Sequence, residues 1–455
     1  MSPTPTPSGT PPSGGRLPLG SDDLGIDERA TGNESEPTAV FGKEDRERSA
    51  GHSDPPRLSF IVLALLVVAI LYTVGRTVLR PAVDRYTTTD EYFFMRWIDV
   101  LVVGWLLWVT SSIGSFLNVV AHRIPIGKSL GGRSRCPKCQ VTLASRDNVP
   151  VLGWFAIRGR CRNCRRSVSR RYPIVEAAVG VSMTLMLTTL LFNFPRPHHH
   201  PIYGGSFEHV DVTAANFARM ACVVAAGFAT WSIALMTWDG TEPTTAWLWG
   251  GSVVIAGIYL FVPDVMMVSW KQIEAGRSFR PGHLDAIARV LTAVVMAIFT
   301  SRTLARALAP AADLKLAPLA KDSRTMIALV ALLTPVMLVI GWQTGLAVVV
   351  ITSLVMALSA SWLRRDRVDG DARRPHPAGR FAVLLFPVTA VVFAVWGGLH
   401  SRVWFPTDVA PPGTILAWAA AMLLSPIWMT RSGDDPGGDR HLLHDDDAER
   451  DHATT

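Results

Sequence analysis

The stretch Gly114–Glu176 carries the most informative pattern of this 455-residue chain. It reads GSFLNVVAHRIP (114–125), RCPKC (135–139), NVPVLGWFAIRGRCRNC (148–164) and SRRYPIVE (169–176). Two CxxC pairs lie in it, 21 residues apart, within a basic loop between two apolar runs; they are Cys136 with Cys139 and Cys161 with Cys164. Four thiolates at such spacing are typical of a tetrahedral zinc site, because each CxxC turn presents two sulfurs to one metal. The stretch therefore predicts a zinc-binding loop between two helices.

The composition predicts a membrane protein. Hydrophobic residues make up 49% of the chain, charged residues 18%, and the mean hydropathy is +0.26. A helix needs about 20 apolar residues to cross the bilayer core. Ten runs qualify: 59–78, 98–120, 173–193, 214–238, 245–263, 284–308 (interrupted by Arg289, Arg302 and Arg306), 325–341, 343–362, 381–399 and 413–430. We expect an all-α polytopic membrane protein with about ten transmembrane helices and a small cytoplasmic zinc-knuckle loop. The pair 325–362 can also form a bent hairpin around Gly341.

The distribution of cations predicts the orientation. Loop 121–172 contains thirteen Lys and Arg residues against the single acid Asp147, which places it in the cytoplasm by the positive-inside rule. Alternation of the ten spans then puts both termini in the cytoplasm, together with the basic loops 310–324 and 363–380. No stacking aromatics accompany these cations, so the pattern does not favour a nucleic-acid partner. Anionic lipid headgroups suit the cationic run 158–171 better.

Cytoplasmic thiols stay reduced, which favours metal binding over disulfides for the four loop cysteines. The alternative, a redox CxxC, usually opens a helix in a thioredoxin-like βαβ unit, and the sequence contains no such pattern. The fifth cysteine, Cys222, falls inside a span, where ordinary packing is expected. The triplet at 198–200, three histidines in a non-cytoplasmic loop, is interpreted as an exposed polar loop rather than a metal site.

Composition also divides the chain. Residues 1–57 are rich in Pro, Ser, Gly, Thr and acids and are predicted to be disordered. The remaining boundaries are an extra helix and loop at 58–97, the cysteine-containing domain at 98–176, a transmembrane domain at 177–400, an extra helix at 401–431, and an acidic, disordered tail at 432–455.

The block Gly114–Glu176 resembles the N-terminal domain of bacterial prepilin leader peptidases (type IV prepilin peptidase / N-methyltransferase). The resemblance covers the GSFLNVV span end, the HRIP exit, both CxxC pairs, the linker between them and the RYPIVE entry. It implies a multi-pass enzyme of the bacterial plasma membrane that cuts prepilin or pseudopilin leaders at the cytoplasmic face. It also implies N-methylation of the new terminus with S-adenosylmethionine in many members. The N-terminal head and extra span lie outside this pattern.

The family's peptidase uses two aspartates at the membrane edge, one of which can take a proton while the other donates one. The first closes a span soon before an Ile-Pro or Leu-Pro step, and here Asp239 closes 214–238 ahead of Pro243. The string Val262-Pro263-Asp264 is a competing match, but the predicted topology puts Asp264 on the other side of the membrane.

The family's second aspartate lies in a GxGDxKL motif, and this chain contains no GxGD. When Gly341-Trp342-Gln343 is aligned with the span end that follows this motif in the family, the position of the second catalytic aspartate falls near Leu329. A leucine side chain cannot exchange protons. The nearest carboxylate that could replace this second aspartate is Asp313, in the string Asp313-Leu-Lys-Leu316, and Asp322 is the next candidate. The predicted topology puts Asp285 on the opposite side of the membrane from Asp239.

Three functions remain open at this point. In the first, the protein is a working aspartic peptidase that uses Asp239 with Asp313. In the second, it is a noncatalytic scaffold or binding protein in pilus or secretion assembly. In the third, it retains only the methyltransferase activity. The sequence contains no glycine-rich strand–turn–helix for the methyl donor, so S-adenosylmethionine rests on the resemblance alone.

Overall fold

The computed structural model describes residues 63–74 except 64 and 72, 89–192 except 137, 213–268 except 242 and 243, 282–308, 321–363, and 377–431 except 401. Side chains within a few helical stretches, including 321–324 and 360–363, are also outside this description. The predicted disordered head and tail, the histidine triplet 198–200, Asp313 and most of the basic loop 363–380 lie outside the described residues.

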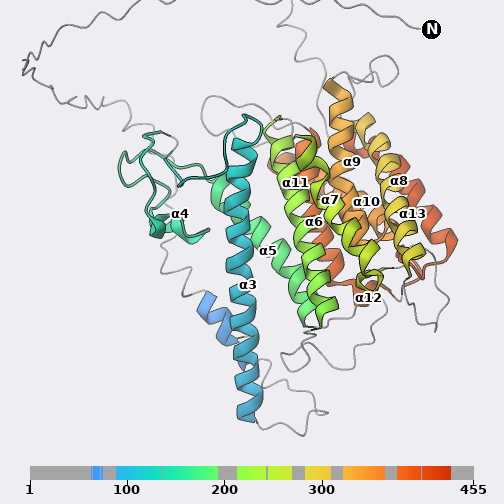
Figure 1. Ribbon diagram of the computed structural model, residues 1–455, viewed down its shortest axis with the longest axis horizontal. Helices are drawn as coiled ribbons and strands as arrows, with labels where there is room; N and C mark the ends of the chain where they lie inside the picture. The colour runs from blue at the N-terminus through green and yellow to red at the C-terminus, as the bar shows by residue number, and fades with distance from the viewer. Residues whose placement is uncertain are drawn as a thin grey trace, which may run out of the picture. The chain divides into compact units, whose positions relative to one another are not determined.

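The described residues form helices and no strand; their only β contacts are isolated bridges in the cysteine loop. The all-α prediction is confirmed. The helices, labelled in Figure 1, are α3 (Thr89–Arg123), α4 (Leu152–Ala156), α5 (Arg171–Leu191), α6 (Ala214–Trp238), α7 (Thr245–Phe261), α8 (His283–Leu308), α9 (Lys321–Ile340), α10 (Trp342–Leu363), α11 (Pro377–Ala394), α12 (Trp396–His400) and α13 (Pro412–Arg431). Two short 3-10 turns are η1 (Ser145–Asp147) and η3 (Pro263–Val265).

Among the described residues, seven helices are long and apolar enough to cross a membrane: α3, α5, α6, α8, α10, α11 and α13. The predicted spans 245–263 and 325–341 correspond to α7 and to Thr325–Ile340 of α9, which are apolar but shorter. The predicted span 59–78 falls mostly outside the described residues, although residues 65–71 are helical. The chain is therefore a polytopic helical membrane protein.

A few contacts define the direction in which each helix runs. The Asn216 amide at the start of α6 donates to the carbonyl of Leu190 at the end of α5 (3.3 Å), so these two helices are antiparallel. The Tyr259 hydroxyl near the end of α7 donates to the carbonyl of Leu338 near the end of α9 (3.2 Å), so α7 and α9 run in the same direction. His283, which begins α8, lies 2.9 Å from the carbonyl of Leu260.

The helices therefore have two sets of ends. The loop end contains the end of α3, the cysteine loop, the start of α5, the end of α6 and the starts of α7 and α9. The far end contains the ends of α7 and α9 and the starts of α8 and α10. Gly341, with φ of +93°, separates α9 from α10 at the far end, as the bent-hairpin interpretation predicts.

Small residues allow α3 and α5 to approach closely. A Cβ on Gly114 would lie 2.9 Å from the Cα of Glu176, and a Cβ on Gly180 would lie 2.2 Å from the Ser111 hydroxyl oxygen. Such close approach of backbones through small residues is a common way for helices to pack in membranes, where lipid offers no hydrophobic drive. This pairing sets the two helices from which the cysteine loop extends.

Candidate metal centre and catalytic carboxylates

Each CxxC pair lies in a short knuckle, and the two knuckles share one backbone pattern. In the first, the Cys136 N–H donates to the carbonyl of Val141 and the Gln140 N–H donates to the carbonyl of Cys136, both at 2.9 Å. Gln140 has φ of +58°, which turns the chain directly after the second cysteine. The same pattern recurs in the second knuckle, with a φ of +54° at its turn residue and bonds of 2.9 and 3.0 Å among Cys161, Arg165 and Arg166.

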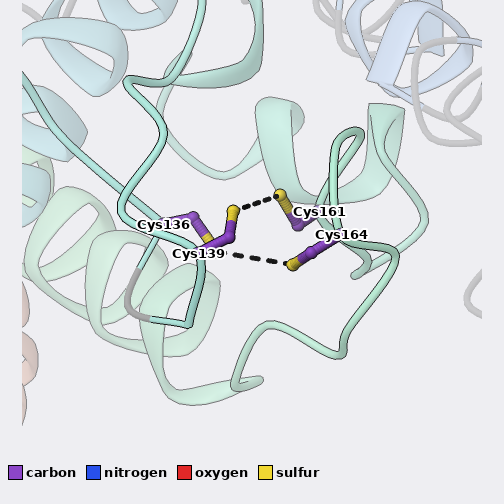
Figure 2. A group of neighbouring side chains, drawn as sticks. All are labelled: Cys136, Cys139, Cys161 and Cys164. Atoms are coloured by element: carbon purple, nitrogen blue, oxygen red, sulfur yellow. Dashed lines mark hydrogen bonds between the residues drawn. The ribbon is translucent and has the colours of Figure 1, made fainter. Parts of the chain in front are cut away.

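The two knuckles bring their four sulfurs together, as Figure 2 shows. Cys136 Sγ lies 3.9 Å from Cys164 Sγ, and Cys139 Sγ lies 3.9 Å from Cys161 Sγ. All four sulfurs lie within 4.8 Å of one another. A tetrahedron with zinc–sulfur bonds of about 2.3 Å has sulfurs about 3.8 Å apart, whereas a disulfide needs about 2.05 Å. The four thiols therefore fit a structural zinc ion, as the sequence predicts.

The thiol pKa values indicate the same chemistry. The backbone N–H of Val141 is the main cause that lowers the pKa of Cys139 to about 6, and the Asn163 amide contributes. At Cys164 the backbone N–H of Arg166 lowers the pKa, but burial and the three neighbouring thiol groups outweigh it and raise the pKa to about 11. Hydrogen bonds thus lower the pKa of some thiols of the cluster, while burial and hydrogen bonding with the other thiols raise the pKa of Cys164. Loss of all four thiol protons would put several mutually repelling negative charges close together. A divalent cation at the centre would remove that repulsion.

The linker between the knuckles packs on itself. The Trp154 indole N–H donates to the carbonyl of Val168 (3.0 Å), and its ring covers Gly159 so closely that a Cβ there would lie 2.7 Å from it. Asp147, the loop's only acid, accepts two hydrogen bonds from the Nε of Arg162 at 2.7 and 2.8 Å. Sequence positions that lack an obvious role on their own thus hold the small loop together.

One contact fastens this linker to α5. The Val151 N–H donates to Oε2 of Glu176 (2.6 Å), and Val151 has φ of +60°, which is unusual for a β-branched residue. Glu176 is 9% exposed and packs against Gly114 of α3. Glu176 therefore contacts both Gly114, at the other end of this block, and Val151, in the linker between the knuckles.

Asp239 caps α6 at the loop end and forms a two-pronged ion pair with Arg171, the first residue of α5. Arg171 Nη2 lies 2.7 Å from Asp239 Oδ2, and Nη1 bonds Oδ1. The Asp239 side chain is 25% exposed and that of Arg171 37%. The turn that follows has Gly240 at φ of +66°. The ion pair joins the first candidate carboxylate to the residue at which the cysteine loop re-enters the helices.

The other candidate carboxylates lie in different places. Arg219, in the second turn of α6, donates to the backbone carbonyl of Asp264 (2.8 Å), so Asp264 lies at the far end, about 30 Å along α6 from Asp239. Asp285 caps α8, where its Oδ2 accepts from the N–H of Gly282 (3.0 Å), also at the far end. The expected opposite placement of both residues is confirmed.

The place of the second aspartate remains a prediction. Leu329, at the aligned position, is 2% exposed within α9. Asp313 lies outside the described residues, and Asp322 falls in the first turn of α9 at the loop end, with its side chain outside the description. Sequence reasoning also missed the Arg171 partner of Asp239, because the two residues are 68 positions apart and Arg171 is one cation among many in its loop.

Comparison with known proteins identifies the segment that contains this centre. A family model described as the bacterial peptidase A24 N-terminal domain matches residues 109–190. A prepilin leader peptidase/N-methyltransferase of Myxococcus xanthus (strain DK1622) is 50% identical over 70 residues, which are 15% of this chain and 21% of the relative. A type 4 prepilin-like proteins leader peptide-processing enzyme of Escherichia coli O78:H11 is 42% identical over 92 residues, 16% of this chain and 34% of the relative.

A prepilin leader peptidase/N-methyltransferase of Stutzerimonas stutzeri is 37% identical over 93 residues, 15% of this chain and 32% of the relative. The matched segments thus span about a third of these relatives or less. No solved structure matches. Residues 109–190 of this chain are therefore similar to the bacterial peptidase A24 N-terminal domain and to the matching part of these enzymes.

Proposed function

We propose that this protein is a membrane-embedded prepilin peptidase that cleaves prepilin or pseudopilin leaders at the cytoplasmic face of the bacterial plasma membrane. The observation that carries the proposal is the ion pair between Asp239 and Arg171. It puts a carboxylate against the domain that the chain shares with named leader peptidases, at the membrane edge where those residues meet. Relatives with that domain are named for this activity, which supports the same activity here.

The orientation follows from charge. The loop end contains the basic cysteine loop and the exposed Arg302 and Arg306 near the end of α8. Cationic loops remain on the cytoplasmic side of membranes, so the loop end faces the cytoplasm in this proposal. The substrate's leader, which emerges from the cytoplasmic leaflet, then meets Asp239 there.

The chemistry needs two carboxyl groups and a water molecule. Asp239, held as one half of an ion pair, acts as the general base that takes a proton from water as it attacks the scissile carbonyl. A second carboxyl group, protonated, donates a proton to the leaving amine, and the proposal assigns this role to Asp313, which lies ahead of α9 in the chain. Asp322 is the next candidate, because α9 begins at the loop end.

Arg171 acts on Asp239 rather than on the substrate. Its two bonds orient the carboxylate and stabilise its charge, and they also occupy both of its oxygens. Each carboxylate oxygen can still accept a further hydrogen bond, and the Asp239 side chain is 25% exposed, so water can reach the base while the ion pair persists. Arg171 is a positioning residue in this proposal.

Zinc supplies no step of the reaction. Cys136, Cys139, Cys161 and Cys164 would hold it, and it would supply a fixed, folded loop in a segment too small to form its own core. Methyl transfer from S-adenosylmethionine is a further expectation that comes from the names of the relatives, and labelled methyl incorporation into cleaved pilin tests it separately.

A leader-cleavage assay tests the proposal. Membranes that contain the protein are mixed with a prepilin from the same bacterium, beside Asp239→Asn, Asp313→Asn, Asp322→Asn and Asp264→Asn variants. The proposal expects cleavage by the unmodified protein, loss with Asp239→Asn and Asp313→Asn, and activity retained with Asp264→Asn at the far end. Loss with Asp322→Asn instead of Asp313→Asn moves the second role to Asp322. A folded, zinc-loaded protein that cleaves nothing supports the scaffold function.

Arg171→Gln separates positioning from catalysis. Removing the guanidinium leaves the carboxylate without its orienting bonds, so we expect kcat for cleavage to fall while KM stays unchanged and some activity persists. An unchanged kcat contradicts a positioning role for Arg171.

A further inference from the structure

The first turn of α11 contains a buried cation, Arg380, to which the described residues contribute no ion-pair partner. Arg380 is 8% exposed, and its Nε has no hydrogen-bond partner. None of the ion pairs formed within the described part of the chain includes it. A buried charge is costly to hold away from water unless an opposite charge and hydrogen bonds accompany it. Arg380 therefore needs an anion that the described protein residues do not supply.

The position of Arg380 is defined by its neighbour in the chain. A Cβ on Gly379 would lie 2.6 Å from the Cα of Trp238, the last residue of α6. The start of α11 thus touches the end of α6, one residue before Asp239. Side chains on a helix lean toward its N-terminus, which directs Arg380 toward the loop end.

We call the place where the start of α11 touches the end of α6 the corner. The charged groups described there give it a net positive charge. The contact with Trp238 puts Asp239, the next residue of the chain, close to this corner, and Arg171 bonds both of its oxygens. That pair is neutral as a unit, so the charge of Arg380 remains. The N-terminus of α11 adds a partial positive charge. A guanidinium beside a helix N-terminus is well suited to bind a tetrahedral oxyanion.

The depth of the corner relative to the membrane indicates which anion can bind there. The membrane-spanning part of α11 begins at Pro377, three residues before Arg380. The phosphates of phospholipids lie at this boundary between the hydrocarbon core and water, and anionic lipids are attracted to basic segments on the cytoplasmic side. An oxyanion at this depth is thus already provided by the bilayer.

We propose that Arg380 and the N-terminus of α11 form a binding site for the phosphate of an anionic phospholipid, beside Asp239. The lipid supplies the missing counter-charge and fills the corner between α6 and α11. This site lies outside the matched domain 109–190 and does not depend on peptidase activity.

Native mass spectrometry of the full-length protein in detergent micelles doped with phosphatidylglycerol tests the site. We expect retained phosphatidylglycerol on the unmodified protein and about tenfold weaker retention with Arg380→Gln, since a hydrogen-bonded charge of this kind accounts for roughly one decade in affinity. Phosphatidylcholine, which carries no net charge, and inorganic phosphate serve as the other two ligands. Retention that inorganic phosphate displaces at low millimolar concentration identifies a free anion site and overturns the lipid assignment.

Arg302→Gln is the matched control. Arg302 is an exposed arginine near the loop end of α8, so its loss removes the same charge without touching the corner. The proposal expects this variant to retain phosphatidylglycerol as the unmodified protein does. Equal loss in both variants shows a general charge effect and overturns the proposal.

Arg380→Lys covers the case in which the glutamine variant fails to fold. Lysine retains the charge but presents no planar fork, so weakened and not abolished retention is expected. A thermal-shift series adds a second readout: phosphatidylglycerol must raise the unfolding temperature of the unmodified protein more than that of Arg380→Lys. Equal shifts in both proteins overturn the proposal. So does a loss of lipid in Asp239→Asn equal to that in Arg380→Gln, because it would show that Arg380 acts together with Asp239 and is not a lipid site of its own.

Discussion

At the scale of single residues, we propose that the partly exposed ion pair of Asp239 and Arg171 matters more for function than for stability. The pair has good two-pronged geometry, but its side chains are 25% and 37% exposed, so water screens it. Its position at the junction of α5 and α6 is what gives it a role, because it sets where the carboxylate lies relative to the cysteine loop.

The first prediction concerns this pair. Asp239→Asn should lower the free energy of unfolding by only about 1 kcal/mol or less, because exposed ion pairs contribute little. Thermal unfolding followed by tryptophan fluorescence measures it. Arg171→Gln should cost a similar amount, and the double variant should cost less than the sum of both. A loss of several kcal/mol from Asp239→Asn contradicts the proposed functional role and indicates a structural one.

The second prediction uses two glycines with the same backbone. Gly159 and Gly127 both have φ of +65°, but a Cβ on Gly159 would meet the Trp154 ring at 2.7 Å, whereas one on Gly127 would meet nothing within 4 Å. Each Ala substitution costs about 1 kcal/mol of left-handed strain. Only Gly159→Ala should also displace the ring and speed the release of zinc to a chelator. Equal release rates in the two variants would contradict the role of this contact in holding the loop.

At the scale of elements, the cysteine loop and the helix pair that bears it are separate units of stability. The loop has few apolar residues in its interior and relies on the four-sulfur cluster, whereas α3 and α5 are held by close packing at Gly114 and Gly180. The Thr110 hydroxyl, 2.8 Å from that of Thr184, adds a buried hydrogen bond between the two helices. The loop should therefore unfold without the helices.

The third prediction follows from this independence. Purified protein should contain about one zinc per chain, and a strong chelator or Cys161→Ser should remove it. The far-ultraviolet helical signal should barely change, while proteolysis between Lys128 and Arg170 should increase sharply. Cys222→Ala, a buried cysteine in α6 away from the cluster, is the control and should retain zinc. Loss of helical signal on chelation would show that zinc supports the whole bundle.

At the scale of the whole molecule, polar and electrostatic interactions at the far end join distant segments. Arg289 of α8 is 1% exposed, bonds the carbonyl of Leu338 at 3.2 and 3.1 Å, and interacts electrostatically with Asp408, which is fully buried in the loop before α13. The Thr344 hydroxyl at the start of α10 donates to the carbonyl of Pro406 in the same loop (3.1 Å). These contacts fasten the C-terminal helix to the rest of the bundle.

The fourth prediction tests this anchor. Asp408→Asn should cost about 3–5 kcal/mol, because it leaves the charge of Arg289 buried without its counter-charge. The double substitution Arg289→Met with Asp408→Leu should restore most of the loss, since it removes both charges. Thermal unfolding in one detergent measures all three proteins. A single variant as stable as the unmodified protein would show that the pair contributes nothing.

Much of the architecture could be predicted because it depends on local properties. The length of an apolar run determines whether a helix can cross the bilayer, so nine of the ten predicted spans correspond to described helices. Two CxxC turns determine the metal ligands, because each turn presents its own sulfurs. The position of Asp239 at a helix end is likewise visible in the sequence. The helices α7 and α9 differ from their predicted spans only at the ends: α7 ends two residues early, and α9 begins four residues early, in the polar residues 321–324.

The sequence by itself determined the apolar helices, the four cysteines of the candidate metal site and the first candidate carboxylate, because each depends on residues close together in the chain. Only the tertiary structure decided that Arg171 pairs with Asp239, that Asp408 acts electrostatically on Arg289, and that the Nε of Arg380 has no hydrogen-bond partner in the described part of the chain. The physical reason is that a charge takes its partner from whichever helix packs beside it. Basic residues are numerous here, and their spacing along the chain does not indicate which of them packing will bring to an acid.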